Sequence, residues 1–295
     1  MNVETANYFK TTDGEQIFYS TNFSSRELTS DDTVLMFNYG LVCSNHHWSK
    51  QLSFFDEKGY KILIHDYRGH YQSTGKSQLE NITFKNIASD MKELCDYLGI
   101  QSTVQIGHSM GVNVALEFAR RWPELTKKVV VISGTAIPVY NIMFDTNLTE
   151  QVTPALIKGL SKFPTIFKSA WKYGGGNPIV KKIVHHGGVN VDTVPEEFIE
   201  IYLNRLGVLG PELFFQLIEQ MNKHDILSYL PQIESETLVI GGDQDKVIPN
   251  YLQKLLVKEL PNAKLYLVRK GSHVPQVDFP SFINERIDLF LTQSL

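Results

Sequence analysis

The pentapeptide Gly107-His108-Ser109-Met110-Gly111 decides how this chain folds. It follows residues 103–106, whose apolar run predicts a strand, and it leads into residues 109–122, whose spacing predicts a helix. Gly-x-Ser-x-Gly between a strand and a helix is the pattern of a nucleophile elbow, in which a serine stands on a strained turn. Both glycines fit that turn, because bulky side chains beside Ser109 would collide with neighbouring elements. We therefore interpret Ser109 as a nucleophile.

Strands and helices alternate on both sides of this turn. Runs that predict strands stand at 8–10, 16–23, 34–37, 61–65, 103–106, 128–133, 237–240 and 264–268. Stretches with helical spacing stand at 48–58, 84–98, 109–122, 247–260 and 279–291. An Asp13-Gly14 turn joins the first two strands and predicts a hairpin. The expected fold class is α/β, a mostly parallel, doubly wound sheet with helices on both faces.

The alternation stops between residues 135 and 220. This stretch contains helical pieces punctuated by proline and glycine and no convincing strand. The expected organisation is one α/β core, residues 1–134 and 221–295, interrupted by a helical insertion at 135–220. Aromatic residues are dense in the insertion: Tyr140, Phe144, Phe163, Phe167, Trp171, Tyr173, Phe198, Tyr202, Phe214 and Phe215. We expect some of them to line an apolar pocket or to contact lipid.

A serine hydroxyl needs a general base, because it is a poor nucleophile at neutral pH. His273 lies in a loop after the last predicted strand, so it is expected at the same sheet edge as Ser109. His108 adjoins Ser109, but its side chain is expected to point away. Three further histidines lie inside a predicted strand or the insertion and compete poorly: His65, His185 and His186.

The base in turn needs an acid that orients it. Asp243 and Asp245 both follow the predicted strand 237–240, and position alone leaves both open. With either one, the chain order is Ser, Asp, His, the order found in hydrolases with a nucleophile elbow.

With these motifs in place, the sequence resembles the α/β-hydrolase superfamily over nearly its whole length. The family patterns are an oxyanion loop, Asp-x-Arg-Gly-His-Gly-x-Ser, Gly-x-Ser-x-Gly-Gly, Gly-x-x-Asp-x-x-x-Pro and a late Gly-His. Their counterparts here are Tyr39-Gly40-Leu41, Asp66-Tyr67-Arg68-Gly69-His70-Tyr71-Gln72-Ser73, the 107–111 pentapeptide, residues 242–249 and His273. The resemblance implies that Asp245 is the acid and that the backbone N–H groups of Leu41 and Met110 form the oxyanion hole. It also implies that the insertion is a cap or lid.

Three departures from the family pattern stand near the expected site. Tyr39 replaces the usual histidine before Gly40, and Val42 stands where many members have glycine, which predicts a stiffer loop. Val112 replaces the second glycine after the elbow. None of these changes removes catalytic chemistry.

The expected function is hydrolysis of a carboxylic ester or related acyl compound with an apolar part, through an acyl-enzyme. No metal or organic cofactor is required. Serine at position 109 argues against dehalogenase and epoxide hydrolase chemistry, because relatives with those activities carry aspartate there. A C–C bond hydrolase, an aminopeptidase, a thioesterase and a perhydrolase remain open on the same scaffold. For an aminopeptidase, Glu196, Glu197 and Glu200 are candidates to bind the substrate amine. A ligand receptor with little turnover is the alternative outside enzymes.

Adjacent to the expected oxyanion loop, His46-His47-Trp48 is a candidate pocket wall, with Trp171 as a candidate from the insertion. A metal site there is not expected, because adjacent histidines point in different directions on a helix.

Composition excludes several classes of protein. The net charge of −4 lacks the basic excess with which a nucleic-acid binder meets phosphates. The sequence contains no run of about 18 apolar residues, so no transmembrane segment is predicted. No secretory signal is visible and the two cysteines, Cys43 and Cys95, are expected to be free thiols, so a cytoplasmic protein is expected. The predicted partner is a small apolar ester or acyl substrate, with the oligomeric state left open.

Overall fold

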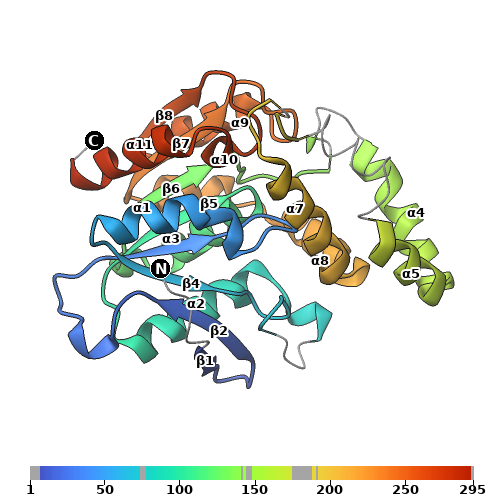
Figure 1. Cartoon of the computed structure of the whole chain (residues 1–295), viewed down its shortest axis with the longest axis horizontal. Helices are drawn as coiled ribbons and strands as arrows, with labels where there is room; N and C mark the ends of the chain where they lie inside the picture. The colour runs from blue at the N-terminus through green and yellow to red at the C-terminus, as the bar shows by residue number, and fades with distance from the viewer. Residues whose placement is uncertain are drawn as a thin grey trace.

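The computed structural model describes residues 7–73, 78–140, 142–143, 148–174, 188–190 and 192–293. Eight strands form one sheet in the order β1-β2-β4-β3-β5-β6-β7-β8 (Figure 1). Their bounds are β1 Asn7–Lys10, β2 Gln16–Thr21, β3 Val34–Asn38, β4 Lys61–His65, β5 Thr103–His108, β6 Thr126–Ile132, β7 Glu236–Gly242 and β8 Ala263–Val268. The pairings from β4 through β3 and β5 to β8 are parallel, as the alternation predicted.

The first two strands form the predicted hairpin. β1 pairs with β2 in antiparallel fashion, and β2 pairs with β4 in the same sense. Gly14 has a φ of 94°, a left-handed conformation that glycine adopts without steric cost. The Asp-Gly signal therefore marks the one edge of the sheet that is not parallel.

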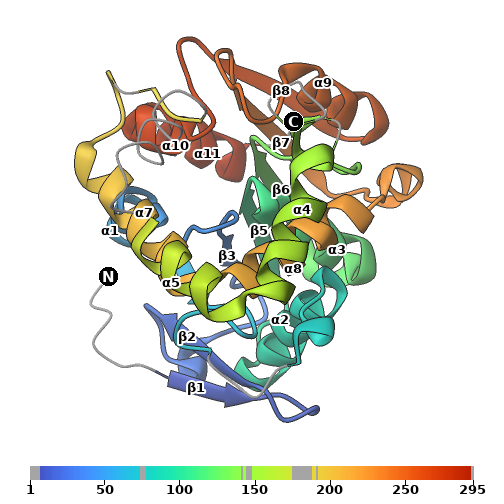
Figure 2. The same ribbon diagram turned by 90° about the vertical axis from the view of Figure 1, so that its right-hand side faces the viewer.

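Helices cover both faces of the sheet. The helices of the core are α1 Ser49–Glu57, α2 Phe84–Leu98, α3 Met110–Arg121, α9 Asn250–Glu259, α10 Pro275–Asp278 and α11 Pro280–Thr292. α1 and α11 pack together on one face, and α2, α3 and α9 lie on the other (Figure 2). This arrangement confirms the doubly wound fold.

Among the helices that begin later than their apolar spacing suggested, α1 and α9 show the reason. α1 begins at Ser49, after a 3₁₀ helix at Asn45–Trp48. α9 begins at Asn250 and not at residue 247, because the N–H groups of Val247 and Ile248 donate to the carboxylate of Asp245 instead of entering a helix. In both places, side-chain hydrogen bonds or a 3₁₀ turn compete with the first helical turn.

The described part of residues 135–220 is helical and contains no strand. Its helices are α4 Leu148–Lys162, α5 Pro164–Gly174, α7 Glu196–Leu209 and α8 Pro211–Lys223. They lie together beyond one edge of the core, at the right of Figure 1 and facing the viewer in Figure 2. The expected boundary at residue 220 falls inside α8. Phe144, His185 and His186 lie outside the described residues.

Among the described residues, no helix is both long enough and apolar enough to cross a membrane.

Candidate active site

Ser109 stands on a strained turn between β5 and α3. Its φ is 53° and its ψ is −120°, a combination that L-residues rarely adopt. The flanking glycines are required by close approach, because a Cβ on Gly107 would lie 2.5 Å from the carbonyl oxygen of Gly111. A Cβ on Gly111 would collide with the carbonyl of Asn38. The local sequence thus forces the serine side chain out of the sheet at the end of β5.

The structure places His273 next to Ser109. Its Nε2 is 3.0 Å from the Ser109 Oγ. The loop that carries it is fixed from behind, because the carboxylate of Asp278 accepts a 2.6 Å hydrogen bond from the N–H of Ser272. Gly242 approaches this loop so closely that a Cβ there would collide with the backbone of Gly271 and Ser272.

The other side of the His273 ring faces Asp245. The Oδ2 and Oδ1 of Asp245 lie 3.0 and 3.2 Å from Nδ1 of His273. The Asp245 side chain is 1% exposed, and its Oδ1 also accepts the N–H groups of Val247 and Ile248. Asp243 is exposed. Of the two aspartates that position left open, the structure brings Asp245 to the histidine.

The contacts of His273 with Asp245 and Ser109 determine which ring nitrogen donates a hydrogen bond and which accepts one. A carboxylate at Nδ1 accepts the Nδ1–H and leaves Nε2 as an acceptor for the serine hydroxyl. Ser109, His273 and Asp245 are therefore connected in the order that proton transfer from a serine requires.

Residues 40–43 form a tight turn beside Ser109. The N–H of Cys43 donates to the carbonyl of Gly40 at 3.0 Å, and Val42 has a φ of 66°. Gly40 packs closely on the nucleophile, since a Cβ there would lie 3.0 Å from the Ser109 Cβ. Met110 is the first residue of α3, so its N–H has no carbonyl four residues back within the helix. Leu41 lines the same cavity as Ser109, and Met110 follows Ser109 directly at the start of α3.

An apolar cavity of about 230 Å³ opens beside Ser109. This volume lies below the 300–1,000 Å³ typical of ligand sites, which favours a small substrate. Its walls come from the Gly40–Cys43 turn, from α7 and α8, and from the loops that carry Asp245 and His273. The side chains from α7 and α8 are Phe198, Ile199, Tyr202, Phe214, Ile218 and Met221.

None of the four expected pocket residues is among the described residues that line this cavity: His46, His47, Trp48 and Trp171. Trp171 packs behind it, with its ring centroid 5.0 Å from that of Phe214 and its Nε1–H bonded to the carbonyl of Leu206. Trp48 is buried against Phe37. Side-chain direction on the helices, which spacing alone did not resolve, accounts for these differences.

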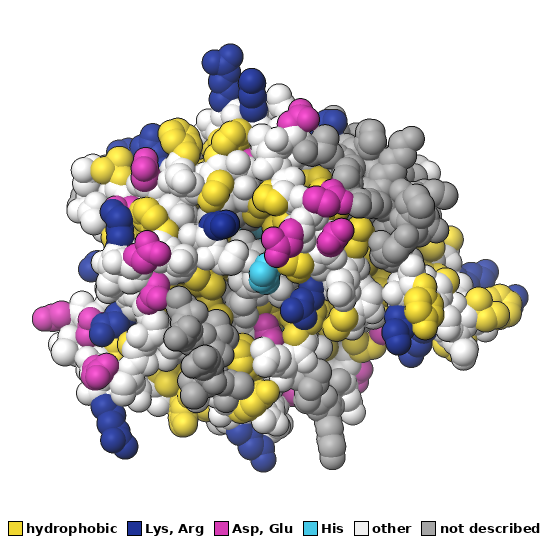
Figure 3. Space-filling model, in the orientation of Figure 1, with side chains coloured by type: hydrophobic (Ala, Val, Ile, Leu, Met, Phe, Trp, Pro, Cys, Tyr) yellow, Lys and Arg dark blue, Asp and Glu magenta, His cyan; other side chains and the backbone are white. Residues whose placement is uncertain are grey.

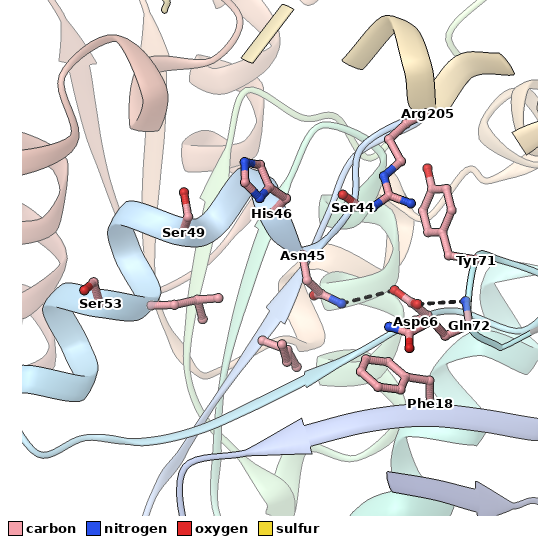
Figure 4. A pocket seen from close by; sticks show the side chains of 12 residues that line it. Phe18, Ser44, Asn45, His46, Ser49, Ser53, Asp66, Tyr71, Gln72 and Arg205 are labelled. Carbon is pink, nitrogen blue, oxygen red and sulfur yellow. Dashed lines mark hydrogen bonds between the residues drawn. The ribbon is translucent and has the colours of Figure 1, made fainter. Parts of the chain in front are cut away.

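The two neighbouring histidines lie near the cavity without lining it. His47 is buried edge-on to Phe198, a cavity residue, with ring centroids 4.6 Å apart, and burial lowers the pKa of His47 to about 3. His46 lines a different cavity of about 480 Å³ (Figure 4). That cavity is larger and more polar, but neither Ser109 nor His273 reaches it.

His108 has a role that sequence reasoning missed. Its Nε2 lies 2.9 Å from the carbonyl oxygen of His273, so it donates a hydrogen bond to the backbone of that residue. Its ring also lines the cavity with Ser109, although we expected it to point away. Burial holds the pKa of His108 well below its usual value, so the ring is neutral. No signal in the sequence pairs residues 108 and 273.

The remaining reactive groups are inert or scattered. Cys43 and Cys95 are both free and buried, as expected. Burial raises the pKa of the Cys43 thiol to about 12, so it is not a thiolate at neutral pH. The described residues contain no group of three or more His, Cys, Asp or Glu side chains placed to hold a metal ion.

Comparison with known proteins agrees with this architecture. The model of the family described as alpha/beta hydrolase fold matches residues 33–164 and 215–280, more than half of the chain. A bifunctional esterase/perhydrolase of Acinetobacter calcoaceticus is 26% identical over 250 residues, which cover 82% of this chain and 83% of that protein. A non-heme haloperoxidase of Rhodococcus erythropolis is 26% identical over 246 residues, covering 80% of this chain and 81% of that protein.

The solved structures give the same result for the fold. A thermophilic esterase from Thermogutta terrifontis superimposes with a TM-score of 0.77 at 19% identity, covering 97% of this chain and 98% of that one. At this identity the likeness concerns the fold. The family match, the sheet order and the serine turn together lead to one conclusion: this chain belongs to the alpha/beta hydrolase fold family.

Proposed function

We propose that the protein is a serine hydrolase that cleaves a carboxylic ester, or a related acyl compound with an apolar part, through an acyl-enzyme. The observation that carries this proposal is the continuous contact line Ser109–His273–Asp245, with 3.0 Å steps, at the wall of an apolar cavity. The serine supplies the nucleophile, the histidine the base, and the cavity room for an apolar acyl or alcohol group.

The mechanism follows from the protons on this line. The Ser109 Oγ attacks the acyl carbon while Nε2 of His273 takes the hydroxyl proton. Asp245 keeps the ring in the correct tautomer and stabilises the imidazolium that forms. His273 then gives its proton to the leaving group. Water enters, and the same histidine activates it to release the acid and free Ser109.

The negative charge on the tetrahedral intermediate needs preorganised donors. In this proposal the N–H groups of Leu41 and Met110 supply them, and the N-terminal end of α3 adds its dipole. Donors of this kind are backbone groups, so the side chains of Leu41 and Met110 matter less than the shape of the turn.

Three alternatives are to be tested against this function: a peroxide-dependent reaction, an aminopeptidase and a ligand receptor. The names of the relatives include a perhydrolase and a haloperoxidase, so a peroxide-dependent reaction belongs in the substrate panel. An aminopeptidase is less favoured, because Glu196, Glu197 and Glu200 are exposed and do not stand among the described residues of the cavity wall. A ligand receptor would hydrolyse about one equivalent, whereas a hydrolase would cycle.

A fluorophosphonate probe tests the nucleophile directly. The wild-type protein should be labelled at Ser109 and should turn over p-nitrophenyl esters many times per molecule. Ser109→Ala should abolish both while leaving the thermal unfolding midpoint close to that of the wild type. Labelling that persists in Ser109→Ala, or a single turnover in the wild type, would contradict the proposal.

Ser133→Ala is a matched control for this experiment. Ser133 is a buried serine that shares a positive φ with Ser109, 50° against 53°, and it follows β6, the strand next to β5. Its removal should leave labelling and turnover unchanged.

A further inference from the structure

Two unusual backbone conformations meet beside the proposed oxyanion hole. Val42 has a φ of 66° and Tyr71 has a φ of 41°. Bulky and β-branched residues rarely adopt such angles, because the Cβ approaches the backbone carbonyl. Both residues stand where the family pattern given above has glycine. The chain therefore holds two residues in strained conformations at places where glycine would carry no strain.

The two residues are in direct contact. The Tyr71 hydroxyl lies 2.8 Å from the carbonyl oxygen of Cys43 and 3.2 Å from that of Val42, and it donates its proton there. These carbonyls belong to the second half of the turn that begins at Gly40. A glycine at position 71 would have no hydroxyl to offer, so the strained tyrosine brings a contact that the family residue lacks.

Tyr71 is also held from its other side. The guanidinium of Arg205, on α7, lies 4.8 Å from the centroid of the Tyr71 ring. Figure 4 shows Arg205 extending from α7 toward Tyr71, with Ser44 close by. The same helix carries Phe198, Ile199 and Tyr202 of the cavity wall. Tyr71 thus lies between the oxyanion turn and the helix that lines the proposed substrate site.

We propose that Tyr71 is a positioning residue for the oxyanion hole, acting through the Gly40–Cys43 turn and held in place by Arg205. Its hydroxyl keeps Val42 at a φ that this residue would otherwise leave. Because residues 40–43 form one closed turn, a change at Val42 tilts the Leu41 peptide and moves its N–H away from the developing charge. The inference rests on the proposed function, since it assigns a role within the same site.

Tyr71→Phe removes the hydroxyl and keeps the ring. Oxyanion stabilisation acts on the transition state and not on ground-state binding, so kcat per active site should fall about tenfold while KM stays within twofold. The affinity for a trifluoromethyl ketone, which forms a tetrahedral adduct with the serine, should fall by a similar factor. Active sites are counted by fluorophosphonate titration, so that loss of folded protein does not imitate the effect.

Tyr60→Phe is the matched control. Its hydroxyl is also part-buried and donates a 2.7 Å hydrogen bond, to Asp288, away from the site. The Tyr60→Phe variant should lose about as much thermal stability as Tyr71→Phe does, and its kcat, KM and ketone affinity should be unchanged. Arg205→Met should reproduce part of the Tyr71→Phe effect, about threefold in kcat, and Arg205→Lys should retain more activity because it keeps the cation.

A double-mutant cycle with Val42→Gly tests the strain directly. Glycine adopts a positive φ without cost, so the turn should no longer depend on the hydroxyl. In the Val42→Gly background, Tyr71→Phe should therefore reduce kcat by less than twofold.

Three results would overturn the inference: equal kcat for Tyr71→Phe and Tyr60→Phe, a change confined to KM, or the same tenfold loss in the Val42→Gly background. Failure of the proposed function is distinguishable, because it would appear as turnover or labelling that survives Ser109→Ala.

Discussion

At the scale of single residues, the site depends on a few backbone positions that tolerate no other side chain. Ser109 is held at a φ of 53° because glycines on both sides let α3 and β3 approach the turn. Asp245 is held by two backbone N–H groups in addition to His273. These contacts hold the proposed reacting groups in place before any substrate binds, as electrostatic catalysis requires.

The acid is the first residue to test. Asp245→Asn should lower kcat by roughly 10⁴, because an amide stabilises the wrong tautomer of His273. Asp243→Asn, two residues away and exposed, should change kcat by less than threefold. Steady-state kinetics on one p-nitrophenyl ester decides between them, and a larger loss in Asp243→Asn would show that the acid is misassigned.

The close packing of the elbow glycines leads to a separate prediction about the free energy of unfolding. Gly111→Ala should destabilise the protein by about 3 kcal/mol, because its Cβ would collide with the Asn38 carbonyl and the backbone must shift. Gly159→Ala in α4 is the control, since a Cβ there meets only Phe167 at 3.6 Å. It should be neutral or stabilise by about 0.5–1 kcal/mol. Urea unfolding measures both, and an unchanged Gly111→Ala midpoint would contradict the close approach.

At the scale of elements, α8 separates the cavity from the aromatic cluster behind it. Phe214 lines the cavity, whereas Phe215 beside it is buried against Trp171 and Phe167. The α8 helix therefore turns one aromatic side chain toward the proposed substrate and the next one away from it. Of the helices in the insertion, α7 and α8 supply side chains to the cavity wall. These two helices therefore connect the proposed cap to the proposed substrate site.

Chain-length preference should follow this division. With p-nitrophenyl esters of about two to ten acyl carbons, esters longer than acetate should be favoured, since each buried methylene contributes roughly 0.8 kcal/mol. Phe214→Leu enlarges the cavity and should move the optimum by one or two carbons, while acetate hydrolysis stays within about threefold. Phe215→Leu makes the same change of side chain behind the cavity wall and should leave the optimum in place. Equal profiles for all three proteins would show that α8 does not select the substrate.

At the scale of the whole molecule, buried neutral histidines make the fold sensitive to acid. Charged side chains of both signs are scattered over the face shown in Figure 3, among apolar side chains, and at its right end apolar and basic side chains stand together. In the interior, burial lowers the pKa of four histidines. The pKa of His47 falls to about 3 and those of His65 and His70 to about 4, while that of His108 lies well below its usual value. Each stays neutral in the folded chain at a pH where the unfolded chain takes up a proton.

The free energy of unfolding should therefore fall as the pH drops below about 6.5. Asp66 and Asp90 oppose this trend, because burial raises the pKa of each carboxyl to about 6 and the folded state gains protons there first. Between pH 7.5 and 5.5 the free energy of unfolding should fall by a net amount on the order of 4 kcal/mol. Urea unfolding at the two pH values measures it, and Asp66→Asn should steepen the fall. A flat profile would show that the histidines are not buried in neutral form.

Local patterns in the sequence determined the order of strands and helices, the serine turn and the choice of His273 as the proposed base. Strand and helix periodicity is a property of neighbouring residues, so residues 61–65 and 84–98 agree with β4 and α2 to the residue. The elbow was predictable for the same reason, since its glycines, its serine and the flanking elements are contiguous. His273 followed from topology, because loops after parallel strands meet at one sheet edge.

Only the tertiary structure decided the contacts between distant segments. It turned Trp171 behind Phe214, tied His108 to the backbone of His273 and set the Tyr71 hydroxyl against the Gly40–Cys43 turn. Each of these depends on side-chain direction and on which loops approach within about 3 Å. Spacing along the chain carries no information about such approaches, because they are set by the packing of the whole fold.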